Sequence, residues 1–221
     1  MHSRPRPAGL GLRTLAFILA VAAFTAACGG GAGPVSSAPA SPASSPAPVA
    51  TAPPLGVRET AYDPARPAPD LRLTDQDGRP FDLASLRGMP VLVYFGYTHC
   101  PDICPTTLAD IRGALRLVEE PVGVVFVTVD PARDDAAAMK QYVDYYQAGF
   151  VGLTGTEAEI AAAADAWGVA YRKLDSTAAA GYAMAHSTEA YLLDAAGQLR
   201  HHLFFGASPE LIAERIREIA G

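Results

Sequence analysis

The sequence contains few cysteines: Cys28, Cys100 and Cys104 are the only three in 221 residues. A chain of this length can bury one conventional hydrophobic core, whereas small disulfide-stapled scaffolds carry a much higher density of cysteine. The scarcity of cysteine therefore excludes a disulfide-stapled mini-protein. Packing must supply the stability, and each cysteine is left as a candidate for anchoring or for chemistry.

An excess of positive charge is also absent. The chain has 17 Lys and Arg residues against 23 Asp and Glu residues, which gives a net charge of -6 at pH 7 with His neutral. Proteins that bind nucleic acid neutralise its phosphates with clusters of Lys and Arg. The composition therefore predicts that nucleic acid is not a partner.

The N-terminal apolar run is too short to cross a bilayer comfortably, since a spanning helix needs about 20 apolar residues. This uncharged run, residues 14–27, follows three arginines and ends in small residues directly before Cys28. The layout predicts a lipoprotein-type signal peptide over residues 1–27, with Cys28 as the lipidated first residue of the mature chain. An uncleaved anchor, or a secreted form with a free thiol, is the alternative. We expect an exported protein anchored to the outer, periplasmic or extracytoplasmic, face of the cytoplasmic membrane.

A segment with almost nothing to bury follows the signal. From Gly29 to about Pro54 the chain consists mainly of Gly, Ala, Pro, Ser and Thr, a composition typical of a solvated, semi-extended tether. We therefore divide the chain into a signal peptide (1–27), a tether (28–60) and one globular domain (61–221).

The domain shows strand and helix patterns in alternation. Apolar stretches predict strands at 91–95, 122–129 and 151–153, with helices at 106–118, 135–147 and 156–167 between and after them. A short hairpin is predicted over 71–83, an extended piece at 169–173, strands at 189–193 and 199–205, and a last helix from Ser208. This order predicts an α/β fold of the thioredoxin-like type, with a central mixed sheet, helices on both faces and an N-terminal hairpin.

Two cysteines lie where the strand at 91–95 leads into a helix, in the run Gly-Tyr-Thr-His-Cys-Pro-Asp-Ile-Cys-Pro at 96–105. On a helical turn, residues spaced i and i+4 have Cα atoms roughly 6 Å apart, which is within disulfide range. The sulfurs of Cys100 and Cys104 can therefore bond to each other or bind one soft ion. The helix that follows lowers the pKa of a thiol near its N-terminus, and Asp102 is a candidate cap for it.

Three segments together resemble the Sco/SenC family. They are the cysteine run at 96–105, the run Val-Thr-Val-Asp-Pro-Ala-Arg-Asp at 127–134, and His-Ser-Thr at 186–188 before a strand ending in Leu-Leu-Asp. Members of this family are thioredoxin-like, membrane-tethered proteins that bind copper through two cysteines and a distant histidine and help assemble the copper site of cytochrome c oxidase.

The resemblance implies a ligand set and partners. The ligands of one copper ion, Cu(I) or Cu(II), would be Cys100, Cys104 and His186, and the partners would be the copper-bearing subunit of the oxidase and other copper chaperones. One departure is Ala185, where family members usually carry Asp before the histidine. We expect His186 in a flexible loop formed by residues 178–185, which would let metal enter and leave.

The donor chemistry agrees with that implication. Thiolates favour Cu(I), and imidazole suits both copper oxidation states, whereas a closed structural zinc site has four ligands. His99 adjoins Cys100, but adjacent side chains of an extended backbone point to opposite sides, so we expect a supporting or surface residue. Asp130 lies where sheets usually build sites and is expected to contact the copper loop or a partner. Asp134 is a candidate helix cap.

Two functions of different classes agree with these residues. The first is a tethered metallochaperone that passes copper to the oxidase by ligand exchange. The second is a thiol–disulfide oxidoreductase that keeps the copper-binding cysteines of the oxidase reduced, with Cys100 and Cys104 as its redox pair. Both need the cysteines, but only the carrier needs His186. A peroxidase function has less support, because a peroxidase works through a single reactive cysteine and has no use for the proline-flanked pair.

Overall fold

The computed structural model describes residues 58–146, 149–175 and 181–220. The chain divides into units 1–47 and 48–221, and the described residues all belong to the second unit. The predicted signal peptide, Cys28 and most of the predicted tether lie outside the described residues. Among the described residues, no helix has the length and apolarity needed to cross a membrane.

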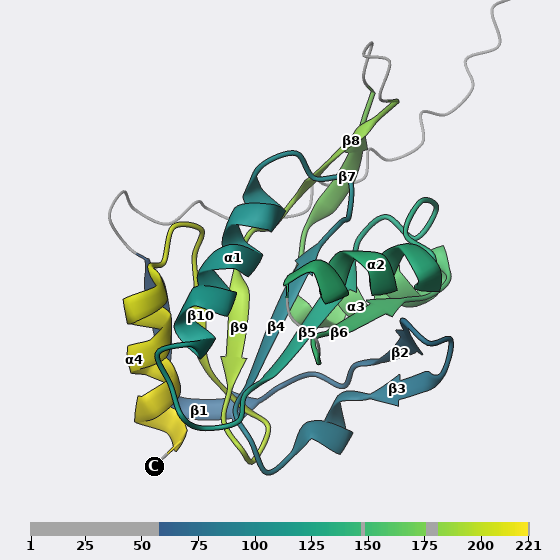
Figure 1. The fold of residues 1–221 in the computed structure, drawn as a ribbon. Coiled ribbons are helices and arrows are strands. Elements are labelled where there is room, and N and C mark those ends of the chain that lie inside the picture. Colours follow the sequence, from purple (N-terminus) through teal and green to yellow (C-terminus); the bar gives the residue numbers. More distant parts are fainter. Residues whose placement is uncertain (1–57, 147–148, 176–180, 221) are drawn as a thin grey trace, which may run out of the picture. The chain divides into compact units, whose positions relative to one another are not determined.

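The described part folds into ten strands and four α-helices (Figure 1). The helices are α1 (Ile103–Leu115), α2 (Ala136–Tyr146), α3 (Glu157–Trp167) and α4 (Pro209–Ala220), and a 3-10 helix covers Leu83–Leu86. The strands are β1 (Glu59–Pro67), β2 (Arg72–Asp75), β3 (Pro80–Asp82), β4 (Val91–Gly96), β5 (Gly123–Thr128), β6 (Val151–Thr154), β7 (Tyr171–Leu174), β8 (Ala183–His186), β9 (Ala190–Leu193) and β10 (Gln198–Leu203).

Eight of these strands form one mixed sheet in the order β1-β10-β9-β4-β5-β6-β2-β3. β4 is parallel to β5 and antiparallel to β9, and β5 is parallel to β6. The predicted α/β class, mixed central sheet and hairpin, here β2–β3, are confirmed. β1 was not predicted, because its polar, proline-containing sequence lacks the signal of a strand; it contains Glu59 and Thr60, the last two residues of the predicted tether.

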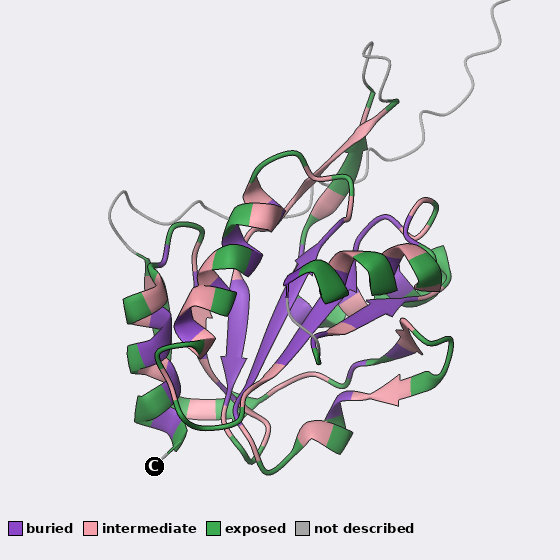
Figure 2. Cartoon of the chain, in the orientation of Figure 1, coloured by how far each residue is buried: buried purple, intermediate pink, exposed green. Residues whose placement is uncertain are grey.

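The central strand β4 is buried along its whole length because helices cover both faces of the sheet. On one face, the ring of Tyr94 contacts Phe126 of β5, which in turn contacts Tyr142 of α2. On the other face, Phe95 contacts Trp167 of α3. Figure 2 shows the same pattern as a buried sheet between helices whose outer sides are exposed. Successive residues of β4 therefore face two different halves of the core.

A second, two-stranded sheet carries the candidate histidine. β7 and β8 pair antiparallel, with Tyr171 opposite His186, and no ladder joins them to the large sheet within the described residues. Figure 1 shows this hairpin extending away from the central sheet, near the start of α1. The predicted flexible loop at 178–185 is therefore wrong for residues 183–185, which belong to β8; residues 178–180 lie outside the described part.

Candidate metal centre

The two cysteines lie at the carboxyl end of β4. Cys100 belongs to the turn after the strand, where its N–H donates to the carbonyl of Tyr97 (3.2 Å). Cys104 is the second residue of α1, which begins three residues earlier than predicted. The N–H of Cys104 points at the Sγ of Cys100 (3.4 Å). The first turn of the helix thus directs a backbone donor at one of the two sulfurs, which favours its thiolate form.

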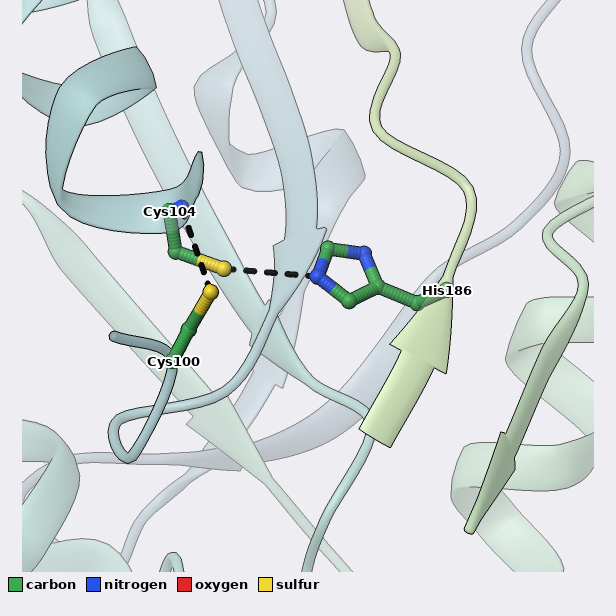
Figure 3. A group of neighbouring side chains, drawn as sticks. All are labelled: Cys100, Cys104 and His186. Carbon is green, nitrogen blue, oxygen red and sulfur yellow. Dashed lines mark hydrogen bonds between the residues drawn. The ribbon is translucent and has the colours of Figure 1, made fainter. Parts of the chain in front are cut away.

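His186 completes the cluster from the last residue of β8 (Figure 3). Its Nε2 lies 3.4 Å from the Sγ of Cys104, and its Nδ1 lies 2.6 Å from the carbonyl oxygen of Ser187. Because a carbonyl only accepts hydrogen bonds, Nδ1 must carry the ring proton in the neutral imidazole. Nε2 therefore directs its lone pair toward the sulfurs, as a metal ligand requires.

The three candidate ligand atoms converge on one point. The two Sγ atoms and a ring nitrogen of His186 all lie within 4.8 Å of one another. An ion with bonds of about 2.0–2.3 Å to nitrogen and sulfur can span such a separation after small side-chain movements. Cys104 is buried, Cys100 and His186 are half-buried, and both thiols are free. Cys100 is thus the more accessible of the two sulfurs.

The two sulfurs differ strongly in acidity. The hydrogen bond from the Cys104 thiol lowers the pKa of Cys100 to about 3; burial opposes this shift, and the hydrogen bond from the N–H of Cys104 adds to it. The pKa of Cys104 is raised, first because its thiol donates that hydrogen bond and then because it is buried. Without metal, the pair therefore holds one thiolate at Cys100 and one thiol at Cys104.

Aromatic rings and a glycine shape the space around the sulfurs. The His186 ring makes edge contacts with Tyr97 and Tyr94, with ring centroids 5.8 and 6.4 Å away. A Cβ added at Gly96 would lie 2.8 Å from the Sγ of Cys104 and 2.8 Å from Cε2 of Phe126. The glycine at position 96 therefore lets the buried sulfur lie against the end of β4.

The other predicted site residues lie outside this cluster. The imidazole of His99 is half exposed, and its Nδ1 lies 3.0 Å from Thr98 Oγ1 and 3.5 Å from a carboxylate oxygen of Asp134. Asp130 is buried and accepts hydrogen bonds from the hydroxyl of Tyr182 and from Arg133. His99 therefore faces away from the ligand atoms, and Asp130 contacts the hairpin that carries His186.

Neither predicted helix cap makes a capping hydrogen bond. Asp102 occupies the N-cap position of α1, but its side chain makes no capping hydrogen bond with the helix. Asp134 is fully buried and accepts from Thr98 and Thr128. The cap of α2 is Asp135, whose carboxylate accepts from the N–H of Ala138 (2.8 Å). Asp134 and Asp135 both directly precede α2 in the sequence. Only their tertiary contacts show which of the two caps the helix.

Two supporting residues, Thr98 and Tyr182, were missed by the sequence analysis. Thr98 has no distinguishing pattern within the cysteine run. Tyr182 does have one: Tyr182, Met184 and His186 alternate with small residues, and this period of two is the signal of a short strand. The adjoining run of Ala, Ser, Thr and Gly obscured it.

The fold and the cluster together define a thioredoxin-like protein with two cysteines and one histidine converging beside its central strand. The sequence profile of the SCO1/SenC family matches residues 59–221, and the chain belongs to this family. The SCO2-like protein of Rickettsia felis is 35% identical over 152 residues, covering 67% of this chain and 74% of that protein. The mitochondrial SCO2 homolog of Mus musculus is 40% identical over 153 residues, covering 67% and 60%.

Solved structures agree with this membership. ScoI of Bradyrhizobium japonicum with copper bound has a TM-score of 0.62 and 35% identity, covering 69% of this chain and 99% of that one. Yeast Sco1 with copper bound has a TM-score of 0.63 and 29% identity, covering 69% and 87%. The thioredoxin-like fold predicted from the sequence is confirmed.

Proposed function

We propose that this protein is a copper metallochaperone that binds one copper ion through Cys100, Cys104 and His186 and delivers it to the copper site of cytochrome c oxidase. The observation that carries this proposal is the convergence of two sulfurs and one ring nitrogen within 4.8 Å. Thiolate and imidazole ligands suit copper in both common oxidation states. The copper bound in similar Sco proteins supports the choice of metal.

The ligand set also suits a carrier. It offers three protein ligands, fewer than a closed structural site, and one of the sulfurs is half exposed. A client cysteine or histidine can therefore approach the ion through Cys100 and displace the ligands one at a time. The family resemblance implies that the client is the copper-bearing subunit of the oxidase. It also implies that other copper chaperones are partners in loading.

Membrane tethering belongs to the same proposal. Lipidation of Cys28 would hold the domain on the outer face of the cytoplasmic membrane, and the segment up to residue 58 would act as a spacer. This arrangement would place the copper site near a membrane-embedded oxidase. Labelling with a radioactive fatty acid tests the anchor, with Cys28→Ser as the control that should carry no label.

A second function, thiol–disulfide exchange, is favoured by the acidity of Cys100. Its thiolate would attack one sulfur of a client disulfide, forming a mixed disulfide and expelling one client thiolate. Cys104 would then lose its proton and attack the Cys100 sulfur, releasing the second client thiol and leaving a Cys100–Cys104 disulfide. The client gains two electrons and the chaperone pair loses them. None of these exchange steps needs Nε2 of His186 as a ligand. We therefore place the carrier function first.

A transfer experiment separates the two functions. The copper-loaded or the reduced metal-free protein is mixed anaerobically with the soluble copper-binding fragment of the oxidase subunit, as its dithiol or its disulfide. A carrier loses its copper to the dithiol fragment, and His186→Ala impairs this transfer while His99→Ala does not. Reduction of the disulfide fragment by the metal-free protein, without any copper transfer to the dithiol, would reject the carrier in favour of the reductase.

A further inference from the structure

The position of His186 depends on contacts outside the β-ladders of the large sheet. The β7–β8 hairpin forms its own sheet, and at its base the N–H of Ser187 donates to the carbonyl of Ala170 (2.8 Å), a bond within the hairpin itself. Backbone pairing therefore fixes the shape of the hairpin, and side-chain contacts with the rest of the domain add to the short link to β9 in placing it against the cysteines.

Such contacts come from the short segment 130–134 between β5 and α2, which we call the anchor segment. The hydroxyl of Tyr182, just before β8, donates to Oδ1 of Asp130 (2.6 Å). Arg133 donates from Nε to Oδ2 of Asp130 (2.5 Å) and from an Nη to the carbonyl of Tyr182 (3.0 Å). The guanidinium carbon also lies 3.7 Å from the centre of the Tyr182 ring. Three interactions thus join the histidine hairpin to two residues of the anchor segment, and the Arg133–Asp130 ion pair holds those two residues together.

The other end of the anchor segment holds the cysteine loop. The N–H and the hydroxyl of Thr98 donate to the two carboxylate oxygens of Asp134 (2.9 and 2.6 Å). The hydroxyl of Thr128 donates to the same carboxylate (2.7 Å). Asp134 is fully buried, and hydrogen bonds to an ionised acceptor are stronger than those between neutral groups. Thr98 precedes Cys100 by two residues, so this contact fixes the start of the cysteine loop.

Backbone hydrogen bonds connect the two acids of the anchor segment, Asp130 and Asp134, within one turn. The N–H groups of Arg133 and Asp134 donate to the carbonyl of Asp130 (3.1 and 3.0 Å), forming a tight turn. Both carboxylates are more than nine-tenths buried. Breaking such a charge-assisted bond leaves a buried group unpaired, which makes the connection costly to release.

We infer that the anchor segment positions both halves of the metal cluster: Asp134 holds the cysteine loop, and Asp130 with Arg133 holds the histidine hairpin through Tyr182. These are positioning residues, since none of them supplies a ligand atom to the cluster. The consequence for copper affinity rests on the proposed function, whereas the consequence for the place of His186 does not. In this way the protein itself places Cys104 beside His186, although 82 positions separate them in the chain.

The test uses the full-length chain with Tyr182→Phe, which keeps the ring and removes the hydroxyl. The matched control is Tyr171→Phe on β7, whose hydroxyl makes no hydrogen bond with another described residue. In the reduced metal-free protein we measure amide hydrogen exchange over Ala183–His186 and the nuclear Overhauser contact between the His186 and Tyr97 rings. We then measure the copper dissociation constant of each variant, in the wild-type and in the His186→Ala background.

Tyr182→Phe should accelerate exchange in β8 about 10-fold or more, weaken the ring contact, and weaken copper binding about 10-fold, as expected for loss of one bond to a charged acceptor. The copper effect should disappear in the His186→Ala background, and Tyr171→Phe should behave as wild type. Arg133→Lys, which keeps the charge but loses the forked geometry, should act in the same direction.

Wild-type exchange and ring contacts in both Tyr182→Phe and Arg133→Lys would overturn the inference. Equal weakening of copper binding with and without His186 would also overturn it, because the effect would then bypass the histidine. If the wild-type chain binds no copper, the proposed function fails, and the exchange and ring-contact measurements still decide the positioning role on their own.

Discussion

The Sγ of Cys104 lies 3.4 Å from the Nε2 of His186, although 82 positions separate the two residues in the chain. The sulfur belongs to the first turn of α1 and the nitrogen to the end of β8. Since the Nδ1 of His186 is held by the carbonyl of Ser187, the ring cannot turn without losing a short hydrogen bond. The fold therefore holds the ring with Nε2 toward the sulfurs, as a ligand role would require.

The acidity of Cys100 predicts unusual thiol reactivity. The thiolate is the reactive form, and a pKa of about 3 keeps Cys100 ionised at every pH above about 4. Alkylation of Cys100 by iodoacetamide, followed by peptide mass spectrometry, should proceed at similar rates at pH 5 and pH 8 and slow only below pH 4. Cys104→Ala removes the thiol hydrogen bond to the Cys100 sulfur, so it should raise the pKa of Cys100 and slow the reaction at pH 5. A wild-type rate that rises tenfold per pH unit between 5 and 8 would contradict the assignment.

The cysteines should give the Cu(II) complex a distinctive spectrum. Thiolate bonded to Cu(II) produces a sulfur-to-metal charge-transfer absorption, so Cys100→Ser and Cys104→Ser should each abolish the wild-type band. Cys28→Ser, which changes the third cysteine of the chain, is the matched control and should leave the band unchanged. Persistence of the band in either of the first two variants would show that its sulfur is not a ligand.

Gly96 is predicted to be intolerant of a side chain. An alanine Cβ would lie 2.8 Å from both the Cys104 sulfur and the Phe126 ring, and overpacking of this kind costs about 1–3 kcal/mol. Gly96→Ala should lower the free energy of unfolding by that amount, as measured in urea, and weaken copper binding by moving Cys104. At the start of β5, the added Cβ of Gly123→Ala meets the end of the Leu86 side chain at 3.2 Å and the Val91 methyl groups at 3.4 and 3.7 Å, so this substitution should cost less. Equal costs for the two variants would contradict this account.

His202 is predicted to make the fold less stable in mild acid. Burial, aided by the nearby charge of Arg66, lowers its pKa from 6.5 to about 4. The unfolded chain therefore takes up a proton at higher pH than the folded one, so the stabilising contribution is complete above pH 6.5 and is lost as the pH falls toward 4. Since the ring is only part-buried, we expect the free energy of unfolding to fall by about 1–3 kcal/mol. Urea unfolding at pH 7 and pH 4.5 should show a smaller difference for His202→Gln; an identical difference would contradict the prediction.

The sequence predicted most of the elements and the three clustered residues, for different reasons. β4, β5 and the helices carry strong local patterns, and the cysteine run is unusual enough to identify a family. β1 and β8 were not predicted because a polar, proline-containing edge strand and a four-residue strand beside a Gly/Ala/Ser loop carry weak local signals. The roles of Asp130 and Asp134 depend on which distant residues meet them, and no local pattern encodes that.

The most direct test of the central claim is an anaerobic Cu(I) titration of the reduced full-length chain against a competing chelator. Wild type should bind one ion tightly, His186→Ala should bind at least 10-fold more weakly, and His99→Ala should match wild type, because the His99 ring faces Thr98 and Asp134 rather than the sulfurs. Since each tenfold change corresponds to about 1.4 kcal/mol, the effect is well within the range of the method. Copper affinity that is the same in His186→Ala and wild type would contradict the account.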